Sequence, residues 1–362
     1  ATVSALEKAD TSVFRMENTN FRTLNDPLLL GYNGTSFFCS TQDSRVTRVM
    51  NRLGYVNYGE SNTYAYGSTA AADSLLSVKY LMSDGTGRPI PAHYVLKKAD
   101  TPLQVYENPY ALPFAFTAPL PTASAFDKSN TFEQQNVWYS NLLGRKAELF
   151  TPCEYKKTSS SDGGLVFDLT AAKGGYYYAV FTQKVRSGCS LQVNGSPVGE
   201  YFASDFSGVA NLGRYKPGDS ISTKLSSSGT SGVAIESEFI YCLDEVEFLR
   251  AIEELRARAA DNLSVVGSTI TASADSEGGN EILWLCVPFE DSWSALVNGS
   301  KTEIIEYDNT FIGIPLERGY NEIKLHYSPV GVAVGIAISL ASALCLCTFV
   351  CIEHKSHKNK TI

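Results

Sequence analysis

The sequence predicts an α+β protein, mostly β, that ends in one transmembrane helix. Three observations predict it: a charge-free apolar run near the C-terminus, a strand-rich pattern that occurs twice about 100 residues apart, and mixed helix and strand patterns before residue 150. Hydrophobic residues make up 44% and charged residues 19% of the chain, as in folded globular proteins. A chain of 362 residues suffices for more than one domain.

We therefore expect an N-terminal mixed α/β domain, two tandem β-sandwich (jelly-roll-like) modules and a membrane anchor. The expected boundaries are 1–150 for the mixed domain, 151–243 for the first β-sandwich, 244–260 for a linking helix, 261–328 for a second, shorter β-sandwich, 329–352 for the transmembrane helix and 353–362 for a basic cytoplasmic tail.

The first 150 residues contain both helical and strand signals. Residues 40–53 suit a capped helix that Gly54 ends. Residues 72–82 begin as a short helix and then run into a strand. Residues 94–97 and 103–106 resemble paired strands. The order of the strands in this domain does not follow from one sequence.

The second half of the chain contains a repeat. Leu191-Gln-Val-Asn194-Gly195 recurs as Ala295-Leu-Val-Asn298-Gly299. Asn-Gly accepts the positive φ values of a type I′ turn, which makes it a strong hairpin signal. Glycine-containing turns follow both copies, again about 100 residues apart, and strands such as 175–181, 282–287 and 321–327 surround them. Each copy therefore predicts one β-sandwich.

A helix is predicted between the two copies, over residues 244–259. Its acidic residues come early and its arginines come late, as the helix dipole favours. The apolar spacing predicts a buried stripe formed by Val246, Leu249, Ile252 and Leu255.

The C-terminal run predicts a membrane span. No charged residue occurs from Ser328 to Ile352. A helix over residues 330–352 would be roughly 34 Å long, enough to cross a hydrocarbon core of about 30 Å. The short tail that follows contains Lys355, Lys358 and Lys360, which indicates the cytoplasmic side. We expect a cell-membrane protein with one span in this chain, its folded part outside the cell and its C-terminus in the cytoplasm.

The first residues, Ala1 to Asp10, show no initiator Met, basic segment or apolar segment of a signal peptide. The simplest interpretation is that the chain is the C-terminal fragment of a longer membrane protein. Its expected partners are the lipid bilayer and upstream transmembrane helices of the same protein.

Several functional classes are disfavoured. The net charge of −8 provides no basic face for nucleic acid. Five cysteines precede the span, with no CxxC pair, so we expect mostly buried free thiols and no zinc site. No nucleophilic triad, GxSxG, HExxH or phosphate-binding glycine loop is present. We expect no catalytic residue, metal or cofactor in this chain.

Blocks spread over nearly the whole chain resemble one protein family. They include Phe14–Glu17, Ala72–Tyr80, Tyr106–Pro113, Phe132–Asn136, Val287–Trp293 and Tyr327–Gly331. Together with the terminal helix, they resemble the C-terminal, extracytoplasmic half of YfhO-type bacterial membrane proteins. The resemblance implies a polytopic GT-C-type glycosyltransferase that moves a sugar from a polyprenyl-phosphate carrier onto a cell-envelope polymer such as teichoic acid. Its catalytic acid would lie in an upstream half, and this part would position acceptor or donor.

The chain departs from the family pattern at two places. Asn298 stands where an Asp-Gly turn is expected, a change that preserves the turn chemistry. Phe114 stands where an Arg often follows Leu-Pro, a change that removes a phosphate contact.

One candidate ligand region is the Gly- and Pro-punctuated loop that contains Asn25, Asp26, Tyr32 and Asn33. Polar loops on a rigid scaffold bind ligands, here a sugar or phosphosugar near the membrane. The alternative is that Asx turns simply hold the shape of the loop.

Three further candidates follow. Lys79 could pair with a phosphate, or instead with Asp73 or solvent. Tyr106 and Asn108 combine an aromatic face with an amide, which suits sugars, but a strand exit bounded by Pro109 explains them equally well. The sandwich repeat and the lack of a catalytic motif motivate a second functional hypothesis, a non-catalytic, membrane-anchored protein that binds glycan or scaffolds a complex.

Overall fold

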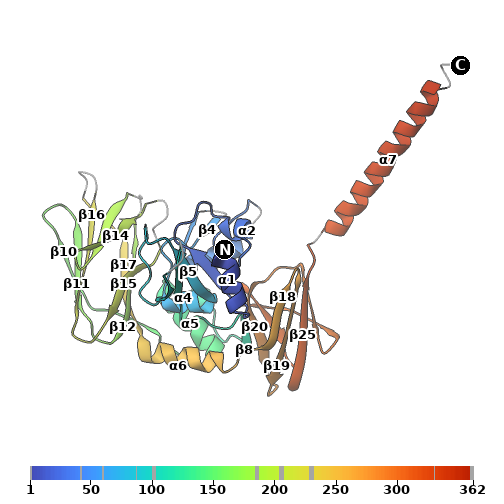
Figure 1. Ribbon diagram of the computed structural model, residues 1–362. Helices are drawn as coiled ribbons and strands as arrows, with labels where there is room; N and C mark the ends of the chain where they lie inside the picture. Colours follow the sequence, from blue (N-terminus) through green and yellow to red (C-terminus); the bar gives the residue numbers. More distant parts are fainter. Residues whose placement is uncertain are drawn as a thin grey trace.

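The computed structural model describes residues 2–40, 43–58, 61–86, 88–99, 103–183, 187–203, 208–227, 232–329 and 331–358. Figure 1 shows the N-terminal domain between two β-sandwiches, with one long helix that extends away from the folded part. The α+β, mostly β fold class is confirmed.

The N-terminal domain contains two small sheets and several short helices. Its first sheet has the order β1-β5-β7-β6, in which β1 and β5 are parallel, and its second has the order β2-β4-β3. The elements are α1 (Thr2–Ala9), β1 (Arg15–Asn18), α2 (Asp26–Leu30), β2 (Phe37–Phe38), α3 (Ser44–Arg52), β3 (Val56–Tyr58), β4 (Ser61–Thr63), α4 (Ala70–Leu75), β5 (Val78–Ser83), β6 (Val95–Lys98), β7 (Gln104–Glu107), β8 (Ala115–Pro119), a 3₁₀ turn η1 (Ala125–Asp127) and α5 (Thr131–Leu143).

Most local predictions in this domain are confirmed. The helix expected from residue 40 begins at Ser44, because the Asp43 side chain accepts the Arg45 amide hydrogen bond and acts as N-cap. Gly54, with φ of 90°, follows the helix as expected. The predicted helix-to-strand transition is α4 followed by β5, and the predicted strand pair is β6 with β7. Of the helix expected over 40–53, residues 41–42 lie outside the described part.

The first β-sandwich packs a five-stranded sheet, β10-β11-β16-β13-β14, against a four-stranded sheet, β15-β12-β17-β9. Apart from β1 with β5, neighbouring strands of the described sheets run antiparallel. The strands are β9 (Phe150–Pro152), β10 (Lys156–Ser159), β11 (Leu165–Thr170), β12 (Gly175–Thr182), β13 (Cys189–Val193), β14 (Ser196–Tyr201), β15 (Ala210–Tyr215), β16 (Ser220–Ser227) and β17 (Ser237–Asp244).

The second β-sandwich includes one strand, β8, from the N-terminal region. Its sheets have the orders β18-β19-β25-β21-β22 and β23-β24-β20-β8. β8 lies outside the expected range 261–328, yet Phe116 pairs with Trp284 and their rings stack at 4.8 Å. The other strands are β18 (Asp261–Val266), β19 (Thr269–Ser276), β20 (Glu281–Pro288), β21 (Trp293–Val297), β22 (Ser300–Thr302), β23 (Ile305–Tyr307), β24 (Phe311–Pro315) and β25 (Gly319–Tyr327).

The sequence repeat is a structural repeat. Asn194 and Asn298 both have positive φ, 48° and 51°, at the predicted Asn-Gly turns. The side-chain oxygen of Asn194 accepts from the Ser222 amide at 2.8 Å, and that of Asn298 accepts from the Glu322 amide at 2.9 Å. Each hairpin is therefore bound to the third strand of its sheet in the same way.

The linking helix is α6 (Glu245–Arg256), with Asp244 as N-cap. Its buried residues are Phe248, Ala251, Ile252 and Leu255. The predicted stripe was wrong at Val246 and Leu249, which are 79% and 37% exposed. The reason is Phe248, which packs edge-on against Tyr110 with ring centroids 5.1 Å apart. The buried face of the helix is therefore centred on the side that carries Phe248.

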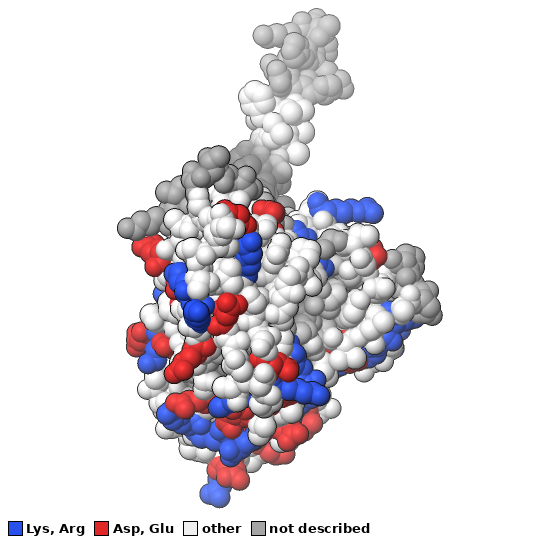
Figure 2. Space-filling model, turned by 90° about the vertical axis from the view of Figure 1, so that its left-hand side faces the viewer, with Lys and Arg blue, Asp and Glu red and all other residues white. Residues whose placement is uncertain are grey.

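The surface carries mixed charge. On the face that Figure 2 shows, acidic and basic side chains alternate, and neither sign forms a continuous patch. Several charged side chains of the protein pair across elements. For example, Arg145 binds both Glu247 and Glu254 of α6, at 2.5 and 2.9 Å, and connects that helix to the end of α5.

The C-terminal helix α7 (Val332–Lys358) provides the membrane segment. Within the described residues, Val334–Ile352 is the one helical stretch long and apolar enough to cross a bilayer. Its described side chains are exposed throughout, which an apolar helix tolerates only in lipid or against other helices.

Candidate functional site

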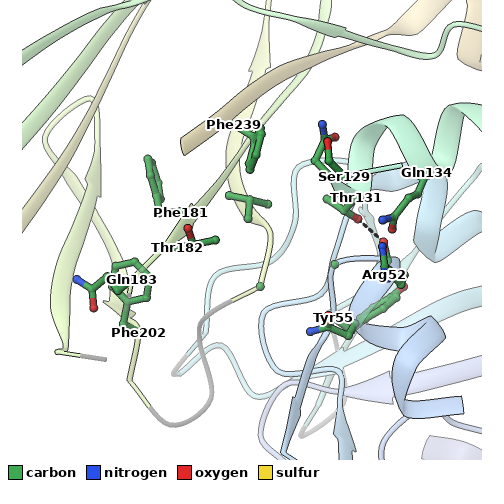
Figure 3. A pocket seen from close by; sticks show the side chains of 15 residues that line it. Arg52, Tyr55, Ser129, Thr131, Gln134, Phe181, Thr182, Gln183, Phe202 and Phe239 are labelled. Atoms are coloured by element: carbon green, nitrogen blue, oxygen red, sulfur yellow. Dashed lines mark hydrogen bonds between the residues drawn. The ribbon is translucent and has the colours of Figure 1, made fainter. Parts of the chain in front are cut away.

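The candidate site is a cleft between the N-terminal domain and the first β-sandwich, with a volume of about 540 Å³ (Figure 3). The end of α3 and the start of α5 form one wall, and β12 and β17 form much of the other. Such volumes are typical of ligand sites, which often lie where domains meet. The lining residues are Asn51, Arg52, Gly54, Tyr55, Ser129, Asn130, Thr131, Gln134, Val180, Phe181, Thr182, Gln183, Phe202, Gly208 and Phe239.

Two glycines let the walls meet. The Val209 amide donates to the Gly54 carbonyl at 2.9 Å, which joins the sandwich to the loop after α3. A Cβ on Gly208 would lie 2.3 Å from that carbonyl oxygen, and a Cβ on Gly54 would lie 2.3 Å from the side chain of Val209. Only glycine at both positions permits this approach.

The wall from the N-terminal domain is polar. The guanidinium of Arg52 donates to the Lys128 carbonyl at 3.2 Å and lies 5.7 Å from the Phe126 ring centroid. The Thr131 hydroxyl donates to the Arg52 carbonyl at 2.5 Å, the bond drawn in Figure 3. Asn130 caps α5 by accepting two backbone amides with its side-chain oxygen. These contacts hold the end of α3 against the start of α5.

Gln134 offers an acceptor in this wall. Its side-chain nitrogen donates to the Lys128 carbonyl at 2.8 Å. Its side-chain oxygen is buried and has no hydrogen-bond partner among the described residues. A buried acceptor without a partner costs free energy, and a ligand hydroxyl in the cleft could relieve that cost.

The sandwich wall contains three phenylalanines. Figure 3 shows Phe181, Phe202 and Phe239 on the side opposite Arg52. Phe239 pairs with Val180 across β17 and β12, and both side chains are half-buried. The Gln183 side-chain oxygen accepts from the Ser187 amide at 2.9 Å. Phe181 and Phe202 are 1% and 6% exposed and belong to the sandwich core, so Phe239 is the ring that a ligand can contact. One phenyl face opposite amides and hydroxyls suits a sugar, whose rings have an apolar face and a polar rim.

The cleft carries little charge. Arg52 is the one charged side chain among its described lining residues. Burial, followed by the nearby Asp73, raises the pKa of Tyr55 well above its usual value near 10, so this phenol stays neutral at physiological pH. Over the described residues there is no group of three or more His, Cys, Asp or Glu that could hold a metal ion.

Four of the cysteines outside α7, Cys153, Cys189, Cys242 and Cys286, are free thiols. Cys189, Cys242 and Cys286 are buried, and Cys39 and Cys153 are partly buried. Burial is the largest influence on Cys286 and raises the pKa of its thiol. Burial likewise raises the pKa of the Cys153, Cys189 and Cys242 thiols. A raised pKa disfavours the reactive thiolate, so these four cysteines behave as small packing residues.

None of the seven ligand residues predicted from the sequence lines this cleft. Asn25 exchanges two hydrogen bonds with the Phe38 backbone, at 2.8 and 3.1 Å. Asp26 is buried and accepts from the Arg22 and Thr23 amides. Both side chains thus make the contacts expected of a shaped loop.

The rest of that loop is held by the buried side chains of Tyr32 and Glu17. Tyr32 is buried in a small hydrophobic cluster, whereas Asn33 is exposed. The buried Glu17 accepts from both the backbone and the hydroxyl of Thr35 and of Ser36. Residue 34 must be glycine, because a Cβ there would lie 2.6 Å from Pro27. Glu17 was not among the predicted site residues.

The other three candidates lie around β5 and β7. Lys79 pairs with Asp10 at 2.5 Å, so the expected Asp73 partner was wrong. The Tyr106 hydroxyl donates to Gln104 at 2.7 Å. Asn108 is buried and its amide donates to the Val78 carbonyl at 3.2 Å.

The Asp10–Lys79 pair predicts a pH effect. Partial burial raises the pKa of Asp10, but hydrogen bonds from Lys79, Ser12 and Tyr80 outweigh it and hold that pKa well below 3.8. Because the pKa of Asp10 is lower in the folded than in the unfolded chain, its ionised form stabilises the fold above about pH 4. This stabilisation is lost as the pH falls toward the pKa of the folded state. Asp10→Asn should lower the free energy of unfolding by about 0.5–1 kcal/mol at neutral pH. Denaturant titrations should show this difference shrinking below about pH 4, whereas a pH-independent difference would contradict the assignment.

The cleft residues were missed because they come from five distant segments. One signal was present: Gln134 lies in Phe132–Asn136, one of the blocks that carry the family resemblance. Nothing local in the sequence indicates that this block faces Phe181 and Phe239.

The chain is similar to known membrane proteins. The family described as "Bacterial membrane protein YfhO" matches residues 1–339. A Bacillus subtilis (strain 168) protein, described as "Uncharacterized protein YfhO", is 23% identical over 381 aligned residues, which cover 94% of this chain and 44% of that protein. The chain therefore spans less than half the length of this curated relative.

Two solved structures show weak similarity. A cycloisomaltooligosaccharide glucanotransferase from Paenibacillus sp. is 8% identical, with 49% of this chain and 45% of that chain covered and a TM-score of 0.19. A conserved protein of unknown function from Pseudomonas aeruginosa PAO1 is 12% identical, with 49% and 92% covered and a TM-score of 0.16. These scores are too low to establish a common fold.

Proposed function

Because this chain belongs to the YfhO family of bacterial membrane proteins, we propose that it is the extracytoplasmic part of a polytopic GT-C-type glycosyltransferase. The whole protein would transfer a sugar from a polyprenyl-phosphate carrier to a cell-envelope polymer such as teichoic acid. The cleft between the N-terminal domain and the first β-sandwich would bind the acceptor polymer. Upstream transmembrane helices would supply the catalytic acid.

The chemistry of the cleft carries this proposal. Phe239, half-buried on β17, offers a ring against which sugar C–H groups pack, whereas Phe181 and Phe202 back this wall from the sandwich core. The unpartnered oxygen of Gln134 accepts a hydroxyl. Arg52 supplies the one cation, which suits a polymer whose sugars or polyols are joined by phosphate.

We assign substrate binding to the cleft and catalysis to other residues, because the cleft lining lacks acid–base groups. None of its described lining residues is a Cys, His, Asp or Glu, so it holds no general base and no strong nucleophile. A site with binding groups and no acid–base pair suits the positioning of a substrate on which other residues act. The same observation favours the second candidate function, a membrane-anchored protein that binds glycan without transferring sugar.

Phe239→Ala tests the cleft. Removing this half-buried ring should weaken binding of purified envelope glycopolymer to the chain by roughly tenfold, or about 1.4 kcal/mol. Sugar transfer by membranes that contain the full-length protein should fall in parallel at limiting acceptor. The matched control is Tyr320→Ala, which removes a ring that is 62% exposed on β25 in the other β-sandwich.

The outcomes separate the two functions. Parallel loss of binding and transfer in Phe239→Ala, with Tyr320→Ala unchanged, supports the transferase. Loss of binding in a full-length protein that transfers no sugar supports the glycan-binding protein. Unchanged polymer binding in Phe239→Ala would exclude the cleft as the acceptor site.

A further inference from the structure

Six exposed apolar side chains gather at the end of the molecule from which α7 leaves. We call them the membrane-proximal patch: Leu28, Leu29, Leu30, Phe38, Val265 and Val266. Figure 1 shows α2 at the upper end, toward which α7 extends, and α6 at the lower end. Single exposed apolar residues are ordinary, whereas a group of them on one face marks a contact surface.

The first part of the patch is α2. Its three consecutive leucines are 67%, 71% and 56% exposed, although the preceding Pro27 is buried. Phe38, 49% exposed, is fixed beside the start of this helix by the two hydrogen bonds between its backbone and Asn25. A short helix that buries its first turn and exposes three leucines has an apolar face without a partner among the described residues.

The second part is the tip of the β18–β19 hairpin. Val265 and Val266 are 42% and 73% exposed there. Thr269, just after the turn, pairs with His326, and the Tyr327 amide donates to the Ser268 carbonyl at 2.8 Å. The hairpin tip therefore lies beside the end of β25, the strand that leads directly into α7.

The two parts belong to one face. Gly34 and Phe37, from the α2–β2 segment, line a cavity of about 160 Å³ together with Pro288. Pro288 also borders a shallow depression with Trp293 and Tyr327 beside the root of α7. The rings of Trp293 and Tyr327 pack edge-on at 5.0 Å. Trp and Tyr favour the headgroup level of a membrane.

The covalent link limits how far this face can be from lipid. From Tyr327 to Val332 the chain makes five steps, which cannot exceed about 17 Å when fully extended.

The charge of residues 20–38 also favours contact with lipid. This segment contains Arg22, which is exposed, and Asp26, whose carboxylate is buried and bonded to backbone amides. This segment thus presents no exposed carboxylate to an anionic lipid surface.

We propose that the folded domains rest on the bilayer through the membrane-proximal patch, with the α2 leucines inserted at the boundary between headgroups and acyl chains. The occupant is lipid, because α7 already places a bilayer at this end of the molecule. Short apolar elements of this kind bind the interface plane without spanning it. The contact fixes the tilt of the domains over the membrane, which a single helix and a short link do not do. The inference requires only the membrane anchor and stands without the proposed sugar transfer.

Tryptophan quenching tests the contact. The chain carrying Leu29→Trp is reconstituted in phosphatidylcholine–phosphatidylglycerol vesicles, with and without bromine on the acyl chains near the headgroups. The matched control is Val246→Trp on α6, a position 79% exposed at the opposite end of the molecule. Emission of the unsubstituted chain is subtracted, because Trp138, Trp284 and Trp293 contribute to every sample.

Brominated lipid should reduce the added emission of L29W by about half or more and leave that of V246W nearly unchanged. Equal emission changes in the two variants would overturn the proposal. The same pair in the full-length protein provides a second arm. If L29W is shielded from brominated lipid there, upstream helices cover the patch, and lipid is not its occupant.

Discussion

Asp73→Ala is expected to lower the free energy of unfolding of the chain by about 3–5 kcal/mol. The Asp73 side chain is completely buried at the centre of a polar cluster. It accepts hydrogen bonds from Tyr55, from Tyr64 at 2.8 Å and from Tyr94 at 3.1 Å, and it lies 2.9 Å from the ring nitrogen Nε2 of His93. Alanine would leave these four groups without their shared acceptor, in a region closed to water.

The cluster also connects to the cleft, because Tyr55 lines it. Denaturant titration of the purified chain, followed by tryptophan emission, measures the effect, since Trp138 and Trp284 are both buried. The matched control is Asp84→Ala, which makes the same change at an exposed site and should leave the free energy of unfolding nearly unchanged. A loss below about 1 kcal/mol for Asp73→Ala would show that the cluster contributes little.

Gly208→Ala is expected to separate the two walls of the cleft. The new methyl group would lie 2.3 Å from the Gly54 carbonyl oxygen, and a backbone atom cannot move aside as a flexible side chain can. The bond from the Val209 amide to the same oxygen would break. We expect a loss of about 2–3 kcal/mol in the free energy of unfolding and a fall in glycopolymer affinity of roughly a hundredfold.

Two measurements distinguish opening of the cleft from general destabilisation. Hydrogen exchange at the Val209 amide should accelerate more than exchange in the β-sandwich cores. Gly174→Ala is the matched control, because its new methyl group would lie 3.8 Å from Pro217, an ordinary contact distance. Unchanged exchange at Val209, or equal effects of the two substitutions, would contradict this account of how the walls meet.

The sequence alone determined features that depend on neighbouring residues. An uncharged run long enough to cross a bilayer predicts α7, because its composition leaves few other stable environments. The Asn-Gly pairs at Asn194 and Asn298 predict two equivalent hairpins, because those residues tolerate positive φ. The transition from α4 to β5 follows from a change of hydrophobic period within a dozen residues.

Tertiary structure decided what depends on segments far apart in the chain. β8 completes a sheet of the second β-sandwich, although more than 160 residues separate Phe116 from Trp284. Lys79 on β5 pairs with Asp10, which lies 69 residues earlier in the chain, and the buried face of α6 is set by Phe248 against Tyr110. The cleft itself exists only where two domains meet. Local patterns report backbone preference and burial, whereas a site between domains depends on packing partners that no local pattern specifies.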